Sequence, residues 1–279
     1  MPNAHTVTPR IAVALVAAML STACFTSETL IRIKADGSGT IEQTHLMNSQ
    51  MIGMATAMAG AAAKEAGATG NLDLNPSEIF SEEQLRRQAA EWGENVRFVS
   101  YTPLEQGPMK GVAAVFAFDD VNALSMGARS RAGAAPTPAG PPMQFGLSTV
   151  AGRSVLSVTF PEGTRAEHAP SSPGAAPNAP PQIPPEALAM VKSMFDGARL
   201  SVAVEVAGRI LASNAPFTSG SRATLVELDF GELLSDPSKL SALQTLKPGV
   251  DFSTVRKTLE GVKGVKLPTH SVVSIEFAK

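Results

Sequence analysis

Apolar and polar residues alternate along several stretches of the chain, a pattern typical of strands that bury one face. The first two stretches, residues 28–34 and 40–46, flank the turn sequence Asp36-Gly37-Ser38. Because glycine supplies the positive φ that a tight turn needs, Asp-Gly between two strands predicts a β-hairpin. The same alternation predicts further strands at residues 96–101, 111–118, 144–150, 154–160, 200–206, 209–213, 223–228 and 271–277.

Helical signals are fewer, and the clearest one covers residues 81–92. Ser81 suits the N-cap, Gln84 completes a capping box, and Gly93 suits the position that ends a helix. An alanine-rich stretch at residues 48–67 predicts another helix. Shorter helices are expected at residues 185–195, 231–234, 237–246 and 253–260.

Four methionines form a stripe at the alanine-rich helix. Met47, Met51, Met54 and Met58 recur every three or four residues, which places them on one helix face. Methionine adapts to irregular apolar partners, so the stripe suits contact with a lipid or another ligand. The alternative is that the stripe covers a sheet as part of the core. We take these four methionines as tentative ligand-binding residues.

The strands follow one another in hairpins rather than in βαβ repeats, which favours antiparallel pairing. The predicted fold class is therefore α+β: a mainly antiparallel β-sheet of hairpins with helices packed on one face and long Pro-rich loops. Those loops are residues 131–142 and 161–185, which are rich in proline and alanine and poor in large apolar side chains. Such segments cannot bury enough surface to offset the entropy of ordering. We expect one domain, residues 24–279, with two domains joined by a linker as the alternative.

The N-terminus has the features of a secretory signal peptide, residues 1–23. Arg10 precedes an unbroken apolar run of ten residues, and small residues follow up to Ala23. Ten helical residues span about 15 Å, half of the hydrocarbon core of a bilayer, so a permanent transmembrane helix is not expected.

Cys24 is the single cysteine of the chain and follows the expected cleavage point. The segment from Leu20 to Cys24 resembles a bacterial lipobox, in which the cysteine becomes the acylated N-terminus of the mature protein. The leucine lies four residues before the cysteine instead of three, and Ser21-x-Ala23 also suits a general signal peptidase. Ordinary secretion is therefore the alternative.

The lipobox resemblance implies that Cys24 carries acyl chains such as palmitate and anchors the protein to a membrane. Stable anchoring needs two or more such chains, because one binds only marginally. The expected location is the bacterial cell envelope, facing the periplasm. Phe25 rather than an aspartate follows the cysteine, which by analogy with enteric bacteria favours the outer membrane over the inner.

Composition and motifs argue against several classes of function, namely nucleic-acid binding, metal binding and catalysis by a known motif. The chain has 23 Lys and Arg against 25 Asp and Glu, a net charge of −2, whereas a nucleic-acid binder needs surplus positive charge. The histidines share no metal-ligand spacing, and the sequence has no GxSxG, P-loop or GxGxxG motif. We therefore expect no metal, no cofactor and no enzymatic activity. A hydrolase with an unrecognised site at His45 or His270 remains an alternative.

Three segments share their patterns with one known family. A strand and the Asp-Gly turn follow directly after Cys24, residues 116–124 are typical of a strand ending in a short acidic helix, and residues 204–215 fit strand, glycine, strand, Ser-Asn. Together they resemble the LppM-domain family of bacterial envelope lipoproteins, with Ala207 and Ala215 where the family typically has Pro and Gly. The resemblance implies an antiparallel sheet with helices on one face, similar to lipid-binding helix-grip folds.

These observations lead to one functional expectation and one main alternative. The expected protein is a non-catalytic, membrane-anchored envelope lipoprotein that binds a lipid or apolar ligand between its sheet and its helices. The alternative is a structural or assembly partner that uses its sheet edges or Pro-rich loops to dock another envelope protein.

Overall fold

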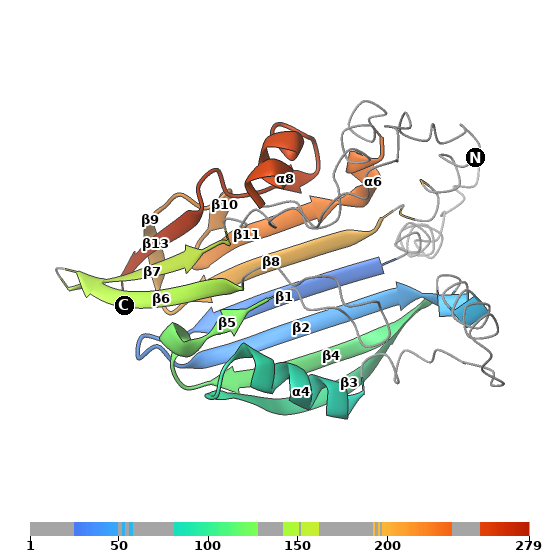
Figure 1. Cartoon of the computed structure of the whole chain (residues 1–279), viewed down its shortest axis with the longest axis horizontal. Coiled ribbons are helices and arrows are strands. Elements are labelled where there is room, and N and C mark those ends of the chain that lie inside the picture. The colour runs from blue at the N-terminus through green and yellow to red at the C-terminus, as the bar shows by residue number, and fades with distance from the viewer. Residues whose placement is uncertain are drawn as a thin grey trace, which may run out of the picture.

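The computed structural model describes residues 25–49, 52–53, 56–57, 81–127, 142–150, 152–161, 192, 195, 197–235 and 252–278. The described chain is mostly β and forms two sheets (Figure 1). The larger sheet has the order β10-β11-β8-β1-β2-β4-β3, with β12 paired to β11. Its strands are β1 (Phe25–Ile33), β2 (Gly39–Asn48), β3 (Val96–Gln106), β4 (Met109–Phe118), β8 (Arg199–Val206), β10 (Phe217–Ser219), β11 (Arg222–Asp229) and β12 (Val265–Lys266).

The smaller sheet has the order β5-β6-β7-β13-β9. Its strands are β5 (Ser125–Met126), β6 (Met143–Val150), β7 (Arg153–Thr159), β13 (Val272–Ala278) and β9 (Arg209–Ser213). In the two sheets of the described residues, every pairing is antiparallel except that of β1 with β8. The parallel pair joins the first strand to a strand far along the chain, so β1 lies inside the larger sheet, between β8 and β2.

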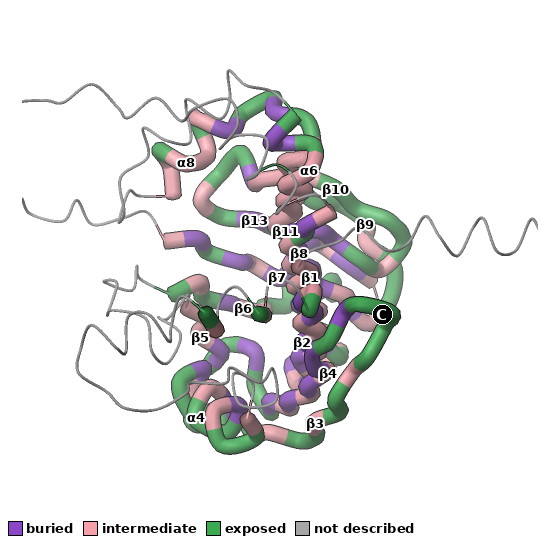
Figure 2. The backbone as a smooth tube through the Cα atoms, turned by 90° about the vertical axis from the view of Figure 1, so that its right-hand side faces the viewer, coloured by how far each residue is buried: buried purple, intermediate pink, exposed green. Residues whose placement is uncertain are grey.

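One apolar core lies between the two sheets. Figure 2 shows the larger sheet edge-on, with β6 and β7 on one side of it. The fully buried residues of this core come from both sheets: Ile31, Ile41, Phe116 and Phe118 from the larger, and Leu156, Ile275 and Phe277 from the smaller. We call the face of the larger sheet that carries Ile31 and Phe116 the inner face.

The described helices are short: α4 (Glu82–Trp92), the 3₁₀ turn η1 (Val121–Ala123), α6 (Phe230–Leu233) and α8 (Phe252–Leu259).

 The predicted α+β class with helices packed on one face is wrong, because the core is closed by a second sheet. Among the described helices, α4 contributes Leu85, Ala89 and Trp92 to this core. Trp92 packs edge-on against Phe116, with ring centroids 4.9 Å apart.

The pairing of β9 explains why the second sheet was not predicted from the sequence. β8 and β9 are separated only by Ala207 and Gly208, which has φ of +115°, and the sequence pattern fits a simple hairpin. In the structure β9 instead pairs with β13, and the chain then returns to the larger sheet through β10 and β11. Non-local pairing therefore outweighs the local turn signal.

The local predictions fare better. The first hairpin is confirmed: Gly37 has φ of +87°, and Asp36 Oδ1 accepts hydrogen bonds from the backbone N and the Oγ of Ser38 at 2.9 and 2.8 Å. The cap of α4 is confirmed too, since Ser81 Oγ accepts from the backbone N of Gln84 at 3.3 Å. Nearly all of the Pro-rich stretches 131–142 and 161–185 lies outside the described residues.

Candidate functional site

The inner face of β1 and β2 changes character along its length. Near the hairpin turn it is apolar, with Ile31 and Ile41 fully buried. Toward the other end of the same two strands the face carries Ser27 and Thr29 on β1, and Gln43 and His45 on β2. These four residues follow the alternation of a strand, so they share the face of Ile31 and Ile41. We call Ser27, Thr29, Gln43 and His45 the polar strip.

The register of the hairpin brings the polar strip together as two cross-strand pairs. Ser27 lies opposite His45, and the Ser27 Oγ to His45 Nδ1 distance is 3.0 Å. Thr29 lies opposite Gln43, and Gln43 Nε2 donates to Thr29 Oγ1 at 3.4 Å. Thr29 and Gln43 are both buried, with 8% and 6% of their surface exposed.

Gln43 leaves one polar atom without a partner. Its Oε1 is buried, and no group in the described part of the chain donates a hydrogen bond to it. A buried acceptor in this condition costs about 1–3 kcal/mol relative to a satisfied one, and such atoms are rare in folded proteins. Among the described residues, the amide oxygen of Gln43 is therefore an unused acceptor.

The polar strip is bordered by apolar side chains on the same face. Met47 lies opposite Phe25, and Val112 of β4 lies opposite His45. Met47 and Val112 are buried, yet neither apolar cluster of the described residues contains them. A few hydrogen-bonding groups on an apolar floor are the usual lining of a site for a small apolar molecule.

The smaller sheet lies over the opposite end of this face. In Figure 1, β5 and β6 lie over the end of the larger sheet at which β1 and β2 are joined, and the far ends of β1, β2 and β4 extend beyond them. The polar strip runs from the middle of these strands, where Thr29 and Gln43 lie, toward the far ends, where Ser27 and His45 lie.

The opposite face of the same strands is charged. Arg32 lies between Glu42 and Glu205, with Nε 2.8 Å from Glu42 Oε1 and Nη1 2.6 Å from Glu205 Oε1. The hydrogen bond to Glu42 and the charges of both carboxylates raise the pKa of Arg32 above its ordinary value. This partly exposed network is typical of a solvated face. The polar side chains of Thr29 and Gln43 differ from it because they are buried.

Only part of the site predicted from the sequence falls within the described residues. Met47 lies at the end of β2 and not on a helix, so its place in a helical stripe is wrong, although it does border the polar strip. Met51, Met54, Met58 and Cys24 lie outside the described residues. Gln43 was not predicted as a site residue. The signal that could have identified it is its position two residues after Ile41 in a predicted strand, which places a polar side chain on the buried face.

The described residues form neither a cluster of metal-binding side chains nor a helix that could span a membrane. No group of three or more His, Cys, Asp or Glu side chains is placed there to hold a metal ion. Among the helices of that same part of the chain, none has the length and apolar character needed to cross a bilayer. His270 is exposed just before β13, whereas His45 lies in β2 of the other sheet.

Comparison with known proteins gives one structural match. The chain is similar to the folded domain of LppM from Mycobacterium tuberculosis, determined by NMR, with 10% sequence identity and a TM-score of 0.31. The match covers 92% of this chain and 91% of that one. This match bears the name of the family that the three sequence segments resemble. No family model matches the chain, and no curated protein matches it.

Proposed function

We propose that this protein is a non-catalytic envelope lipoprotein that is anchored through Cys24 and binds a lipid on the inner face of its larger sheet. The observation that carries the proposal is the buried, unpartnered Oε1 of Gln43. A lipid with a hydroxyl or amide donor that inserts beside the polar strip satisfies this acceptor, and its hydrocarbon packs among apolar side chains such as Met47 and Val112, which are already buried from water.

The position of Cys24 supports the same proposal. It directly precedes Phe25, the first residue of β1. An extended chain rises about 3.3 Å per residue, so Thr29 is within about 17 Å of Cys24 along the strand. Acyl chains on the cysteine hold the polar strip close to the surface from which a lipid is taken, in the envelope and facing the periplasm.

The Ser27–His45 contact raises the question of catalysis. A nucleophilic serine needs a base, a group that orients the base, and donors for the oxyanion. Glu28, next to Ser27, belongs to the opposite face because side chains alternate along the strand. We propose that Ser27 and His45, which contact each other at 3.0 Å, form hydrogen bonds with the polar group of the ligand.

The single tryptophan provides a direct test. Trp92 packs on Phe116, which lies two residues from Ala114, the β4 neighbour of Gln43. Bromine atoms on a lipid chain quench tryptophan fluorescence when they come close. The full chain is placed in phosphatidylcholine vesicles that contain either a brominated monoacylglycerol, which has two hydroxyl donors, or the methyl ester of the same brominated chain, which has none.

We expect stronger quenching of Trp92 by the monoacylglycerol than by the methyl ester. Gln43→Leu should remove this difference, because it removes the acceptor. Thr44→Val, on the same strand and the other face, is the matched control and should retain it. Equal quenching by the two brominated lipids in the wild-type protein would overturn the assignment of Gln43 as the ligand's acceptor.

A further inference from the structure

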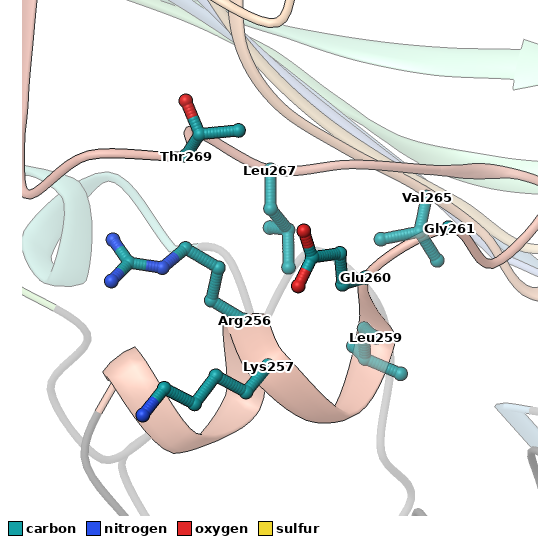
Figure 3. A pocket seen from close by; sticks show the side chains of 8 residues that line it. All are labelled: Arg256, Lys257, Leu259, Glu260, Gly261, Val265, Leu267 and Thr269. Carbon is teal, nitrogen blue, oxygen red and sulfur yellow. The ribbon is translucent and has the colours of Figure 1, made fainter.

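A second candidate site lies near the β11–β12 pair of the larger sheet, where α8 (Phe252–Leu259) ends and the chain turns into β12 (Figure 3). It is a pocket of about 300 Å³. Its apolar floor is formed by Leu259, Val265 and Leu267, which belong to or pack against a small apolar cluster with Leu233. The floor is thus fixed by its own core, separate from the core between the sheets.

Charges of both signs line the same pocket. Arg256 comes from α8, and Glu260 follows the last residue of that helix. In Figure 3 the guanidinium group of Arg256 lies on the side of Thr269 and the carboxylate group of Glu260 lies beside Leu267. No ion pair joins Arg256 to Glu260 within the described part of the chain, although they are four residues apart. A basic residue four positions before an acidic one is the less favourable order for a helical pair.

Unlike Arg256 among the described residues, two basic residues near the pocket form ion pairs. Lys266 and Arg199, in the strands beside the pocket, both pair with Glu227, at 3.2 and 2.8 Å. The local cations therefore find carboxylates where the geometry allows it. Arg256 and Glu260 instead present one cation and one anion across an apolar floor, with Lys257 also lining the pocket.

We propose that this pocket binds a small aliphatic zwitterion, the chemistry of an α-amino acid with a hydrocarbon side chain. The ligand carboxylate pairs with the Arg256 guanidinium group, whose planar fork matches a carboxylate. The ligand ammonium pairs with Glu260. The hydrocarbon side chain covers Leu259, Val265 and Leu267. A simple anion would meet the carboxylate of Glu260, so a ligand with both charges suits the lining better.

The test compares three probes of similar hydrocarbon shape by isothermal titration of the full chain. L-leucine has both charges, 4-methylpentanoate has only the carboxylate, and 3-methylbutylamine has only the ammonium. We expect L-leucine to bind at least about tenfold more tightly than either partial probe, since each charged hydrogen-bonding pair is worth about tenfold or more in affinity.

Two variants then separate the roles of the charges. Arg256→Gln should weaken L-leucine and 4-methylpentanoate but leave 3-methylbutylamine unchanged. Glu260→Gln should weaken L-leucine and 3-methylbutylamine but leave 4-methylpentanoate no weaker. The retained probe shows in each case that the variant is folded. Lys263→Gln, which changes an exposed charge outside the pocket, is the matched control and should bind all three as the wild type does.

Three results would overturn the proposal. The first is L-leucine binding no more tightly than 4-methylpentanoate. The second is an affinity for L-leucine that neither Arg256→Gln nor Glu260→Gln changes. The third is the absence of saturable binding of all three probes at millimolar concentration.

Discussion

Asn214 completes the hydrogen bonding of a strand to which it does not belong. It follows β9, and its Oδ1 accepts from the backbone N of Ser274 in β13 at 2.6 Å, while its Nδ2 donates to the carbonyl of Val272 at 3.0 Å. The amide side chain therefore continues the β9–β13 pairing beyond Ser213, the last residue of β9. This Asn belongs to one of the three segments that resemble the LppM-domain family.

Replacing this side chain should weaken the smaller sheet. Asn214→Ala removes both hydrogen bonds, and we expect the free energy of unfolding to fall by about 1–2 kcal/mol, measured by urea titration. Thr218→Ala, on an exposed residue of β10, is the control and should change it by less than about 0.5 kcal/mol. An Asn214→Ala protein as stable as this control would show that the amide adds nothing to the pairing.

Gln43 permits a test of its unpartnered atom that does not involve any ligand. Gln43→Leu replaces a buried amide with an apolar side chain of similar size, so the unfolding free energy of the ligand-free protein should stay the same or rise by about 1 kcal/mol. Ile41→Ala, two residues earlier on the same face, should lower it by about 2–5 kcal/mol. A loss of more than about 2 kcal/mol in Gln43→Leu would mean that Oε1 already has a donor in the folded protein.

Glu227 should contribute a pH-dependent part of the stability. Burial favours its neutral form, but the hydrogen bond from Lys266 and the positive charges of Arg199 and Lys266 outweigh this, and the pKa of Glu227 lies below its ordinary value of 4.5. A lowered pKa in the folded state stabilises the protein above the unfolded pKa, and the contribution is lost as the pH falls through the folded pKa.

The measurement for Glu227 compares urea unfolding of the wild type and Glu227→Gln across this range. We expect the wild type to be more stable near neutral pH, and the difference to shrink between about pH 5 and pH 3. Glu105→Gln, which removes an exposed partner of Lys110, should show little difference at any pH. A difference for Glu227→Gln that grows on acidification would contradict the lowered pKa.

Membrane anchoring is tested at the cysteine itself. Cys24→Ser removes the thiol that the lipobox resemblance marks for acylation, so the protein should move from the membrane fraction to the soluble fraction. Intact-mass analysis of the wild type should show the added acyl chains. A Cys24→Ser protein that still sediments with membranes, or a wild type of unmodified mass, would refute acyl anchoring.

Local sequence signals predicted the elements of this fold better than their arrangement. The turn at Asp36 and Gly37 and the cap at Ser81 depend on residues close together in the chain, so composition and spacing identified them. The partners of β9 and of β1 depend on residues far away: β13 for the first and β8 for the second. No local pattern contains that information, and a single sheet covered by helices was therefore the wrong arrangement.

The candidate site likewise has one part that local sequence signals give and another part that depends on the packing of the whole fold. The cross-strand pairs Ser27–His45 and Thr29–Gln43 follow from the register of the first hairpin, which the turn sets. The condition that makes Gln43 informative is its burial without a partner for Oε1, which only the packed structure reveals. For Met47 the sequence signal was misleading. The helical spacing of the methionines placed it at a helix, whereas the strand β2 continues through it to Asn48.

The parallel pairing of β1 with β8 also sets the order in which the protein can be completed. Arg32 and its partner Glu205 are 173 residues apart. A ribosome adding about 5–20 residues per second needs on the order of ten seconds or more to make that stretch. Throughout that time one row of backbone N–H and C=O groups on β1 has no neighbour, and an open strand edge is a template for pairing with other chains. Until β8 has been made, this edge of β1 is therefore open to pairing with a strand of another copy.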